Sequence, residues 1–474
     1  MGLCRRRAWL CPGFWNIPIL IELIVLWNIV RERNTAMLYR TKHLLLMVAF
    51  FSLLLPLFSS CGSNMAPSGS QHSATTLSNR HTATPGNGTP QPQNVVLSSC
   101  RGSALSPSVT TLSPSSTQRS IYFGGASGNL YALSAQTGRL RWCIHASVTG
   151  GARCTRPIPC LPPPFVMFGT PTVVDGIVYI CASGGGETGY LYAFNAGDSS
   201  LRWRTQTDCW IVSMPFGDDA IPLVNNGVVY SGLYAVRAQD GEVLWKETHI
   251  NLSQEGELIL LAVADGVVYG RTEGAVYAIN ARDGSILWRY PPHASMTPGG
   301  PLVVSNQILF VGTQGSVDQP ETSALYVINT QNGSLRWYKL MGDYVGTAFL
   351  NNVAYVSSRD QYLYALNMNN GTVLWRHKFI YPVYNPAQPV NGILYINIDG
   401  AYALDSTNGS VLWHKPLGTS QSVDFIPSVV VDGVDYLAST DGQGNSTLYA
   451  LNASTGAEYW HISNLNQISP LVVV

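Results

Sequence analysis

The chain has 474 residues, of which 46% are hydrophobic and only 11% are charged, with 27 basic residues balancing 27 acidic ones. A net charge of zero provides no electrostatic attraction to nucleic acid, so no nucleic-acid partner is predicted. The abundance of glycine (45) and tyrosine (24) is typical of many short strands joined by tight turns, and the length suffices for a large buried core.

A signal peptide is predicted over residues 37–60. Arg40 and Lys42 supply a basic start, and the apolar run Leu44–Phe58 is too short to span a membrane comfortably. Small residues then lead to Cys61 in a pattern that resembles the bacterial lipobox, with Phe58 where leucine is usual. We therefore expect export, with a lipid on Cys61 that anchors the chain to a membrane, facing the outside or the periplasm. A plain cleaved signal or an uncleaved anchor is the alternative.

Residues 1–36 precede this signal, where no further segment is expected. We interpret them as a misassigned N-terminal extension, with translation beginning at Met37. The competing interpretation is a genuine additional helix, with Arg5, Arg6 and Arg7 held on the inner side of the membrane.

Residues 61–118 are predicted to form a disordered tether. The segment beyond Cys61 is rich in Ser, Thr, Pro, Gly, Asn and Gln and has no acidic residue. Such a composition cannot bury enough apolar surface to offset the entropy of ordering the chain. By flexible-chain scaling its reach is on the order of 40 Å, enough to hold a globular head clear of a membrane.

A motif recurs eight times between residues 119 and 474, as in LYALNMNNGTVLW, which begins at Leu363. Each copy has a tyrosine eleven residues before a tryptophan, and seven copies have a glycine four residues before it, with Ser199 as the exception. Successive copies lie 38 to 61 residues apart, which indicates a repeat architecture. The repeated tryptophans are Trp142, Trp203, Trp245, Trp288, Trp337, Trp375, Trp413 and Trp460.

Each repeat is predicted to form four short strands. Apolar residues alternate between turn dipeptides such as Asp175-Gly176 and Asn226-Gly227, which supply the positive φ angles of tight hairpins. Four antiparallel strands in each of eight repeats predict an all-β fold, an eight-bladed β-propeller. The first repeat starts at its second strand, Ser120–Gly125, and a matching first strand occurs at Ile468–Val474. We therefore expect the C-terminal strand to pair into blade one and close a monomeric ring.

The motif resembles the pyrroloquinoline quinone (PQQ)-like propeller repeat. This repeat occurs in quinoprotein alcohol dehydrogenases and in the propeller lipoprotein of the bacterial outer-membrane assembly machine, and the resemblance covers about residues 120–474. It implies that the eight tryptophans pack between neighbouring blades and that the glycines permit close approach. A ring of aromatic ligand-binding residues is the alternative. The fold by itself does not determine the function.

The PQQ-binding features of the dehydrogenases are not recognisable in this sequence. Those enzymes have an adjacent Cys-Cys disulfide, an aspartate base, and glutamate and asparagine ligands to calcium, whereas this chain has no Cys-Cys pair. Its histidines are scattered, without metal-binding spacing. We assign no catalytic, cofactor-binding or metal-binding residue. The pair Asp218-Asp219 is interpreted as part of a solvated loop, with general acid–base catalysis as the alternative.

The six cysteines beyond Cys61 all lie between residues 100 and 209, around the long insertion Ile144–Phe168. An even number in an exported chain favours disulfides, with fifteen pairings open. We expect these bridges to hold the insertion onto blades one and two. Zinc binding is disfavoured because no CxxC motif occurs. The cysteines are Cys100, Cys143, Cys154, Cys160, Cys181 and Cys209.

Trp210 is the one tryptophan of residues 119–474 outside the repeat position. With Met214 and Phe216 it lies in the insertion Thr205–Ala220, where we expect an exposed anchor for a partner; packing beneath the loop is the alternative. These features together predict a non-catalytic, membrane-tethered propeller that binds another envelope protein or ligand. The alternative is a dehydrogenase that uses PQQ and calcium to oxidise alcohols or sugars, and a sensor domain is a third hypothesis.

Overall fold

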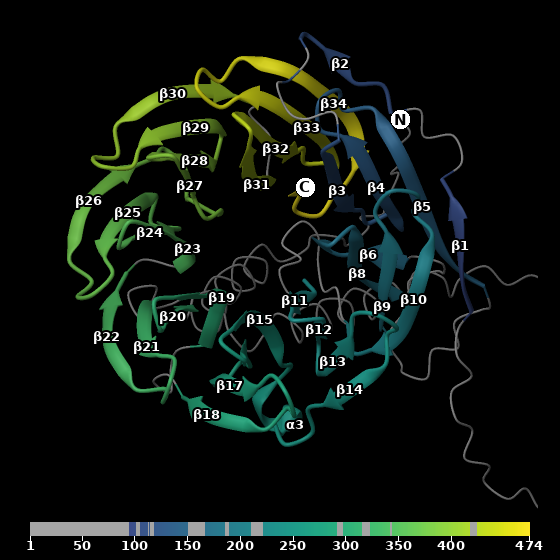
Figure 1. The fold of residues 1–474 in the computed structure, drawn as a ribbon. Helices are drawn as coiled ribbons and strands as arrows, with labels where there is room; N and C mark the ends of the chain where they lie inside the picture. The colour runs from purple at the N-terminus through teal and green to yellow at the C-terminus, as the bar shows by residue number, and fades with distance from the viewer. Residues whose placement is uncertain are drawn as a thin grey trace, which may run out of the picture. The chain divides into compact units, whose positions relative to one another are not determined.

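The structure, a computed structural model, describes residues 94–100, 105–111, 113, 118–149, 166–184, 189–209, 221–291, 297–314, 323–341, 344–417 and 424–474. In these residues the regular elements are β-strands, apart from one short helix, α3 (Leu252–Glu255). The strands form eight antiparallel sheets arranged around a common axis (Figure 1). The predicted all-β fold, an eight-bladed β-propeller with four-stranded blades, is confirmed.

Each blade runs from an inner strand near the axis to an outer strand at the rim. Blade one consists of β35 (Val472–Val473), β3 (Ser120–Gly124), β4 (Asn129–Ser134) and β5 (Leu140–Thr149). In blade two, β6 (Val166–Phe168) and β7 (Thr172–Val174) both pair with β8 (Ile177–Gly184), which is followed by β9 (Gly189–Asn195) and β10 (Leu201–Thr207). Blade three consists of β11 (Leu223–Asn225), β12 (Val228–Ser231), β13 (Tyr234–Arg237) and β14 (Val243–Lys246). Blade four consists of β15 (Ile259–Ala264), β16 (Val267–Arg271), β17 (Val276–Asn280) and β18 (Ile286–Tyr290).

The second half of the ring follows the same order. Blade five consists of β19 (Thr297–Ser305), β20 (Ile308–Gln314), β21 (Ala324–Asn329) and β22 (Leu335–Leu340). Blade six consists of β23 (Tyr344–Leu350), β24 (Val353–Ser358), β25 (Tyr362–Asn367) and β26 (Val373–Lys378). Blade seven consists of β27 (Gln388–Val390), β28 (Ile393–Asn397), β29 (Gly400–Asp405) and β30 (Val411–Pro416). Blade eight consists of β31 (Asp424–Val431), β32 (Val434–Thr440), β33 (Asn445–Asn452) and β34 (Glu458–Asn466).

Two-residue turns with positive φ angles join the first and second strands of blades two to eight. Asp175 and Gly176, for example, have φ angles of 50° and 72°, and Asn226 and Gly227 have 49° and 75°. Asparagine, aspartate and glycine tolerate this region best, and the resulting turn twist matches the twist of the flanking strands. These turns lie on the face that we name the lower face. The loops between blades, together with the turns between second and third strands, form the opposite, upper face.

The ring is closed by the end of the chain. β35 pairs with β3 in antiparallel register, with Val472 opposite Tyr122 and Val473 opposite Ile121. Ser120 and Val474 exchange two backbone hydrogen bonds of 2.7 and 3.1 Å. The predicted pairing of the C-terminal strand into blade one is therefore confirmed.

The prediction that the tether extends to residue 118 is wrong. β1 (Asn94–Ser99) pairs with the outer edge of β5, and β2 (Ser108–Val109) pairs with the outer edge of β34. Val95, Val96 and Leu97 favour a strand within an otherwise polar segment. Both strands pair with outer blade edges, which would otherwise leave backbone groups unpaired. The insertion expected from Ile144 also begins later, since β5 continues to Thr149. Residues 1–36, the signal peptide and Cys61 lie outside the described residues.

Asp435 is a carboxylate in an otherwise apolar ring of the core. It occupies the second position of β32, where the corresponding residues of the other seven blades are all apolar and fully buried: Ile121, Val178, Val229, Val268, Leu309, Ala354 and Leu394. Asp435 is itself fully buried, and its Oδ2 accepts one long hydrogen bond of 3.4 Å from Ser428. Burial therefore raises the pKa of Asp435 from 3.8 to about 7.

Removing the C-terminal strand should destabilise the whole ring. Deletion of Ile468–Val474 takes away the buried side chains of Ile468, Leu471 and Val473, which stabilise the fold by on the order of 5 kcal/mol by area burial. It also leaves the inner edge of β3 open. The expected result is a large fall in the guanidinium midpoint of unfolding, measured by tryptophan fluorescence. An unchanged midpoint would show that the strand is not the closure.

Replacing Asp435 with asparagine should stabilise the protein in a pH-dependent way. Because the pKa of Asp435 is about 7 in the folded state and 3.8 when the carboxyl is solvated in the unfolded chain, the folded state retains a proton between these values. Stability is therefore lost as the pH rises from about 4 to 7, by roughly 4 kcal/mol for three pKa units.

The free energy of unfolding of Asp435→Asn and of the original chain should be compared by denaturant titration at pH 4.5 and pH 8. The gain should be larger at pH 8. Asp265→Asn, in an exposed turn, is the matched control and should show no such difference. A gain for Asp435→Asn that is equal at both pH values would contradict the account.

Candidate interaction surface

The eight repeated tryptophans all lie between neighbouring blades. In each case the indole Nε1 donates a hydrogen bond of 2.8 to 3.3 Å to a backbone carbonyl of the following blade. Trp460 in blade eight completes the ring by donating to Ala135 in blade one. At Gly409 a Cβ atom would lie 2.6 Å from the Trp375 ring, which explains the glycine of the motif.

A second aromatic ring was missed in the sequence. Seven blades place a tyrosine, and blade five places Phe310, with ring centroids 5.8 to 6.3 Å from the repeated tryptophan. The Tyr436 hydroxyl donates to the same Ala135 carbonyl as Trp460, at 3.0 Å. In blades two to eight this aromatic residue stands three positions after the second residue of the hairpin turn, a signal that could have revealed it. The tyrosines are Tyr122, Tyr179, Tyr230, Tyr269, Tyr355, Tyr395 and Tyr436.

Two disulfides join four of the six cysteines named above. Cys100 bonds to Cys143 of β5, and Cys181 of β8 bonds to Cys209, which follows β10. The first bridge holds the segment that carries β1, and the second holds the start of the loop after blade two. Cys154 and Cys160 lie outside the described residues, so bridging of the insertion stays a prediction.

The expected partner anchor also lies outside the described residues, since Trp210, Met214 and Phe216 belong to the loop between β10 and β11. The same holds for Asp218 and Asp219. No group of three or more His, Cys, Asp or Glu that could hold a metal ion is found where the structure describes the chain. Within the same residues, no helix has the length and apolar character to cross a membrane.

A shallow hollow of about 410 Å³ lies on the lower face between blades one and two. Its lining includes the charged side chains Arg141 and Asp175 and the C-terminal residue Val474. The two backbone hydrogen bonds between Ser120 and Val474 run along its wall. The closing strand thus borders the hollow, and we assign no function to it.

The loop from Phe379 to Asn385, between β26 and β27, presents large apolar side chains to solvent. Ile380 is 77% exposed, and Tyr381 and Tyr384 are 53% and 45% exposed. Large apolar side chains that are exposed together on one loop are a feature of interaction sites. We name Ile380, Tyr381 and Tyr384 the loop triad.

The base of this loop is firmly held. Phe379 and Val383 are buried, and their backbone amides donate hydrogen bonds to Gln361 (2.8 Å) and Ser358 (3.2 Å) on the upper face of blade six. The Asn385 amide donates to the Asn397 carbonyl of blade seven, at 3.2 Å. A rigid base lowers the entropy lost when exposed side chains are fixed by a partner.

Polar and aromatic groups surround the loop triad. The Arg359 guanidinium lies 5.6 Å from the ring centroid of Tyr384, a cation–π distance. Tyr402 of β29 stacks on His414 at 3.9 Å and donates a hydrogen bond of 2.8 Å to Asp399. Burial, followed by the Asp399 carboxylate, raises the pKa of the Tyr402 hydroxyl, so this group remains a neutral donor. Tyrosine and arginine beside an aliphatic anchor are the composition of binding hot spots.

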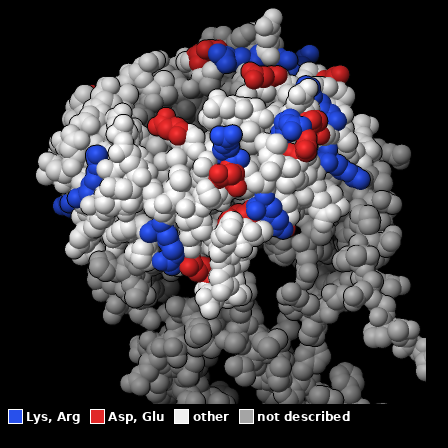
Figure 2. Space-filling model, turned by 60° about the horizontal axis from the view of Figure 1, so that its bottom comes forward, with Lys and Arg blue, Asp and Glu red and all other residues white. Residues whose placement is uncertain are grey.

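Charges of both signs are mixed on the face drawn in Figure 2. Figure 2 shows acidic and basic side chains close to one another, with wide uncharged areas between them. Such pairs include Arg237 with Asp240 at 3.0 Å and Arg289 with Glu255 at 3.0 Å. The face in view therefore has no single-sign patch that would attract a polyanion.

The family profile of the outer membrane protein assembly factor BamB matches residues 96–208, 166–377 and 398–473. A curated BamB of Yersinia pestis is 26% identical over 160 residues, which is 31% of this chain and 35% of that protein. The alignment therefore spans about a third of the relative's length.

Two solved structures are also similar. The computationally designed Ika8 protein superposes with a TM-score of 0.52 and 15% identity, covering 75% of this chain and 96% of that chain. BamB of Moraxella catarrhalis has a TM-score of 0.48 and 14% identity, with 64% and 90% covered. The superposition on Ika8 shows a shared fold. The family profile covers most of the propeller. The chain belongs to the PQQ-like propeller family of the outer membrane protein assembly factor BamB.

Proposed function

We propose that the protein is a non-catalytic binding module of the cell envelope, tethered to a membrane through a lipid on Cys61, whose monomeric ring holds another envelope protein. The observation that carries this proposal is the loop triad, because exposed apolar side chains on a rigid base are suited to a protein partner. Membership of the BamB family supports it, since that family is named for outer-membrane protein assembly.

The sequence also supports a non-catalytic role. It has no adjacent Cys-Cys pair, the feature that in the quinoprotein dehydrogenases covers the cofactor. The polar groups around the loop triad are engaged with one another: Asp399 accepts from Tyr402, and Asp360 accepts from Tyr364 at 2.6 Å. These carboxylates orient tyrosines and are not paired with each other as acid and base.

A photoreactive amino acid at position 380 should cross-link to a partner protein. The full chain with this residue in place of Ile380 would be produced in its own cells, irradiated and analysed by mass spectrometry. Because Ile380 is the centre of the proposed contact, its cross-linking yield to one envelope protein should exceed that at Leu287 at least fivefold. Leu287 is a matched control, an aliphatic residue of the outer strand β18 that is 51% exposed.

Replacing both Tyr381 and Tyr384 with serine should abolish the cross-link from position 380 without changing the unfolding midpoint. Equal labelling at positions 380 and 287 would contradict the assigned surface. Saturable one-to-one binding of PQQ in the presence of calcium, measured by calorimetry, would contradict the non-catalytic role.

A further inference from the structure

Residues 94–113 form a strap across the seam where the ring closes, and the strap is described at residues 94–100, 105–111 and 113. β1 lies along the outer edge of β5, with Asn94 opposite Thr149 and Ser99 opposite Ile144. β2 then lies along the outer edge of β34 (Figure 1). These edges belong to blades one and eight, the first and last of the chain.

The strap makes specific contacts at the seam. The backbone amides of Thr110 and Thr111 both donate to the Tyr459 carbonyl of β34, at 2.7 and 3.0 Å. The Ser113 hydroxyl donates at 3.3 Å to the Ala135 carbonyl, which also accepts the indole bond of Trp460. The strap thus adds a donor to the acceptor that joins blade eight to blade one.

Trp460 is unusually well covered. Its exposed fraction is 0%, compared with 8% for Trp203 and 9% for Trp245, the most buried of the other repeated tryptophans. Pro107 of the strap and the Trp460 ring both border Gly138, where a Cβ atom would lie 3.1 and 2.9 Å from them. The strap therefore packs at the place where Trp460 meets blade one.

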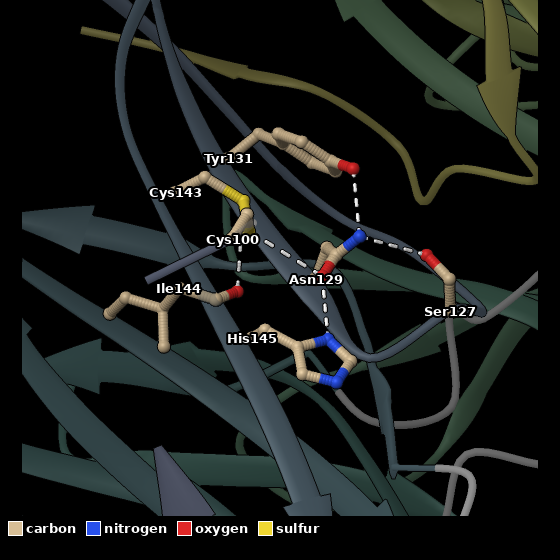
Figure 3. Close-up of a disulfide and its surroundings, with 7 residues drawn as sticks. All are labelled: Cys100, Ser127, Asn129, Tyr131, Cys143, Ile144 and His145. Atoms are coloured by element: carbon tan, nitrogen blue, oxygen red, sulfur yellow. Dashed lines mark hydrogen bonds between the residues drawn. A yellow bond between two sulfur atoms is a disulfide. The ribbon is translucent and has the colours of Figure 1, made fainter. Parts of the chain in front are cut away.

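One disulfide holds the strap, and its two cysteines differ in burial. Cys100 is half-buried, and Cys143 is 8% exposed. Figure 3 shows the bridge beside Asn129, whose Oδ1 lies 3.5 Å from the Cys100 Sγ and 2.8 Å from the His145 Nδ1. The partial exposure of Cys100, beside the polar Asn129 side chain, gives a thiolate a route to this bridge.

The other disulfide provides an internal comparison. Cys181 and Cys209 are 0% and 1% exposed, and their sulfurs lie 2.9 and 2.8 Å from the Ser231 hydroxyl of the next blade. A thiolate must reach a sulfur atom directly to exchange with it. In the folded ring, burial of Cys181 and Cys209 keeps a thiolate from reaching the sulfurs of this second bridge.

We propose that the Cys100–Cys143 bridge is a thiol-exchange site and that its reduction by a dithiol releases the strap. One thiolate of the dithiol attacks a bridge sulfur, a mixed disulfide forms, and the other cysteine leaves as a thiolate and takes up a proton. The second thiol of the reductant then displaces the attached cysteine. Two electrons pass from the dithiol, which becomes a disulfide, to the bridge, which becomes two thiols.

Release of the strap would expose two strand edges at the seam, those of β5 and β34. After reduction the strap is held without a covalent bond, by six residue pairs of β1, two residue pairs of β2 and the hydrogen bonds of Thr110, Thr111 and Ser113. Its departure opens the outer edges of β5 and β34, whose unpaired backbone groups can add an extended strand from another chain. The reduced protein therefore gains a binding edge that the oxidised protein covers with its own residues.

The first test measures which cysteines the reductant reaches. The folded full chain would be treated with dithiothreitol under native conditions, then alkylated and digested for mass spectrometry. Cys100 and Cys143 should be labelled at least tenfold faster than Cys181 and Cys209. Equal rates for both pairs, or labelling of the second pair first, would overturn the proposal.

The second test measures whether the strap leaves. Acrylamide quenching of tryptophan fluorescence should increase on reduction, because Trp460 loses its cover, and this increase should be absent in Trp460→Phe. The double variant Cys100→Ser/Cys143→Ser should show the high quenching without reductant. Selective labelling with no change in quenching would show that the bridge opens but the strap stays, which contradicts the release.

Discussion

The hydrogen bond from each repeated tryptophan to a carbonyl of the next blade is the interaction on which the propeller depends. The indole is a donor only, and left unpaired in the core it would cost about 1–3 kcal/mol. Eight such donors find eight acceptors only if the ring is complete, since Trp460 must reach Ala135 across the chain termini. The tyrosine beside each tryptophan, where present, uses the same acceptor in several blades, as Tyr436 does at the Ala135 carbonyl. The same contact thus joins neighbouring blades at all eight junctions.

The junction between blades eight and one has the tryptophan hydrogen bond of every other junction and three further contacts. β35 supplies the inner strand of blade one, and the strap covers the outer edges of both blades. Arg119 adds an ion pair to Asp432, in the hairpin turn of blade eight. This junction differs from the others in topology, because the chain crosses it from β34 to the inner strand β35 while the other strands of blade one come from the start of the propeller. The strap also brings the Cys100–Cys143 disulfide close to this junction.

Most of the fold could be predicted because each blade is encoded by a short sequence motif that recurs along the chain. The spacing of tryptophan, glycine and turn dipeptides determined blade number, strand order and the closing strand. Tertiary effects determined the rest. The segment Asn94–Ser99 pairs with β5, a partner that its own sequence does not identify. Asp435 could not be recognised as a buried carboxylate from sequence alone, because its burial depends on the packing of the ring. The loop triad was not recognised because FIYPVY has the composition of a core segment, and exposure cannot be read from composition. The predicted anchor at Trp210 lies outside the described residues and stays a prediction.

A closed ring of this kind is a rigid platform, which is what a binding module requires if its exposed loop is to meet a partner without a large entropy loss. Amide hydrogen exchange, followed by mass spectrometry on the oxidised full chain, tests this rigidity most directly. If closure makes the ring one cooperative unit, peptides from β3, β4, β32 and β33 at the seam should exchange as slowly as peptides from β20 and β21 in blade five. Markedly faster exchange at the seam under the same conditions would contradict the account, because it would show that the ring opens there in the native state.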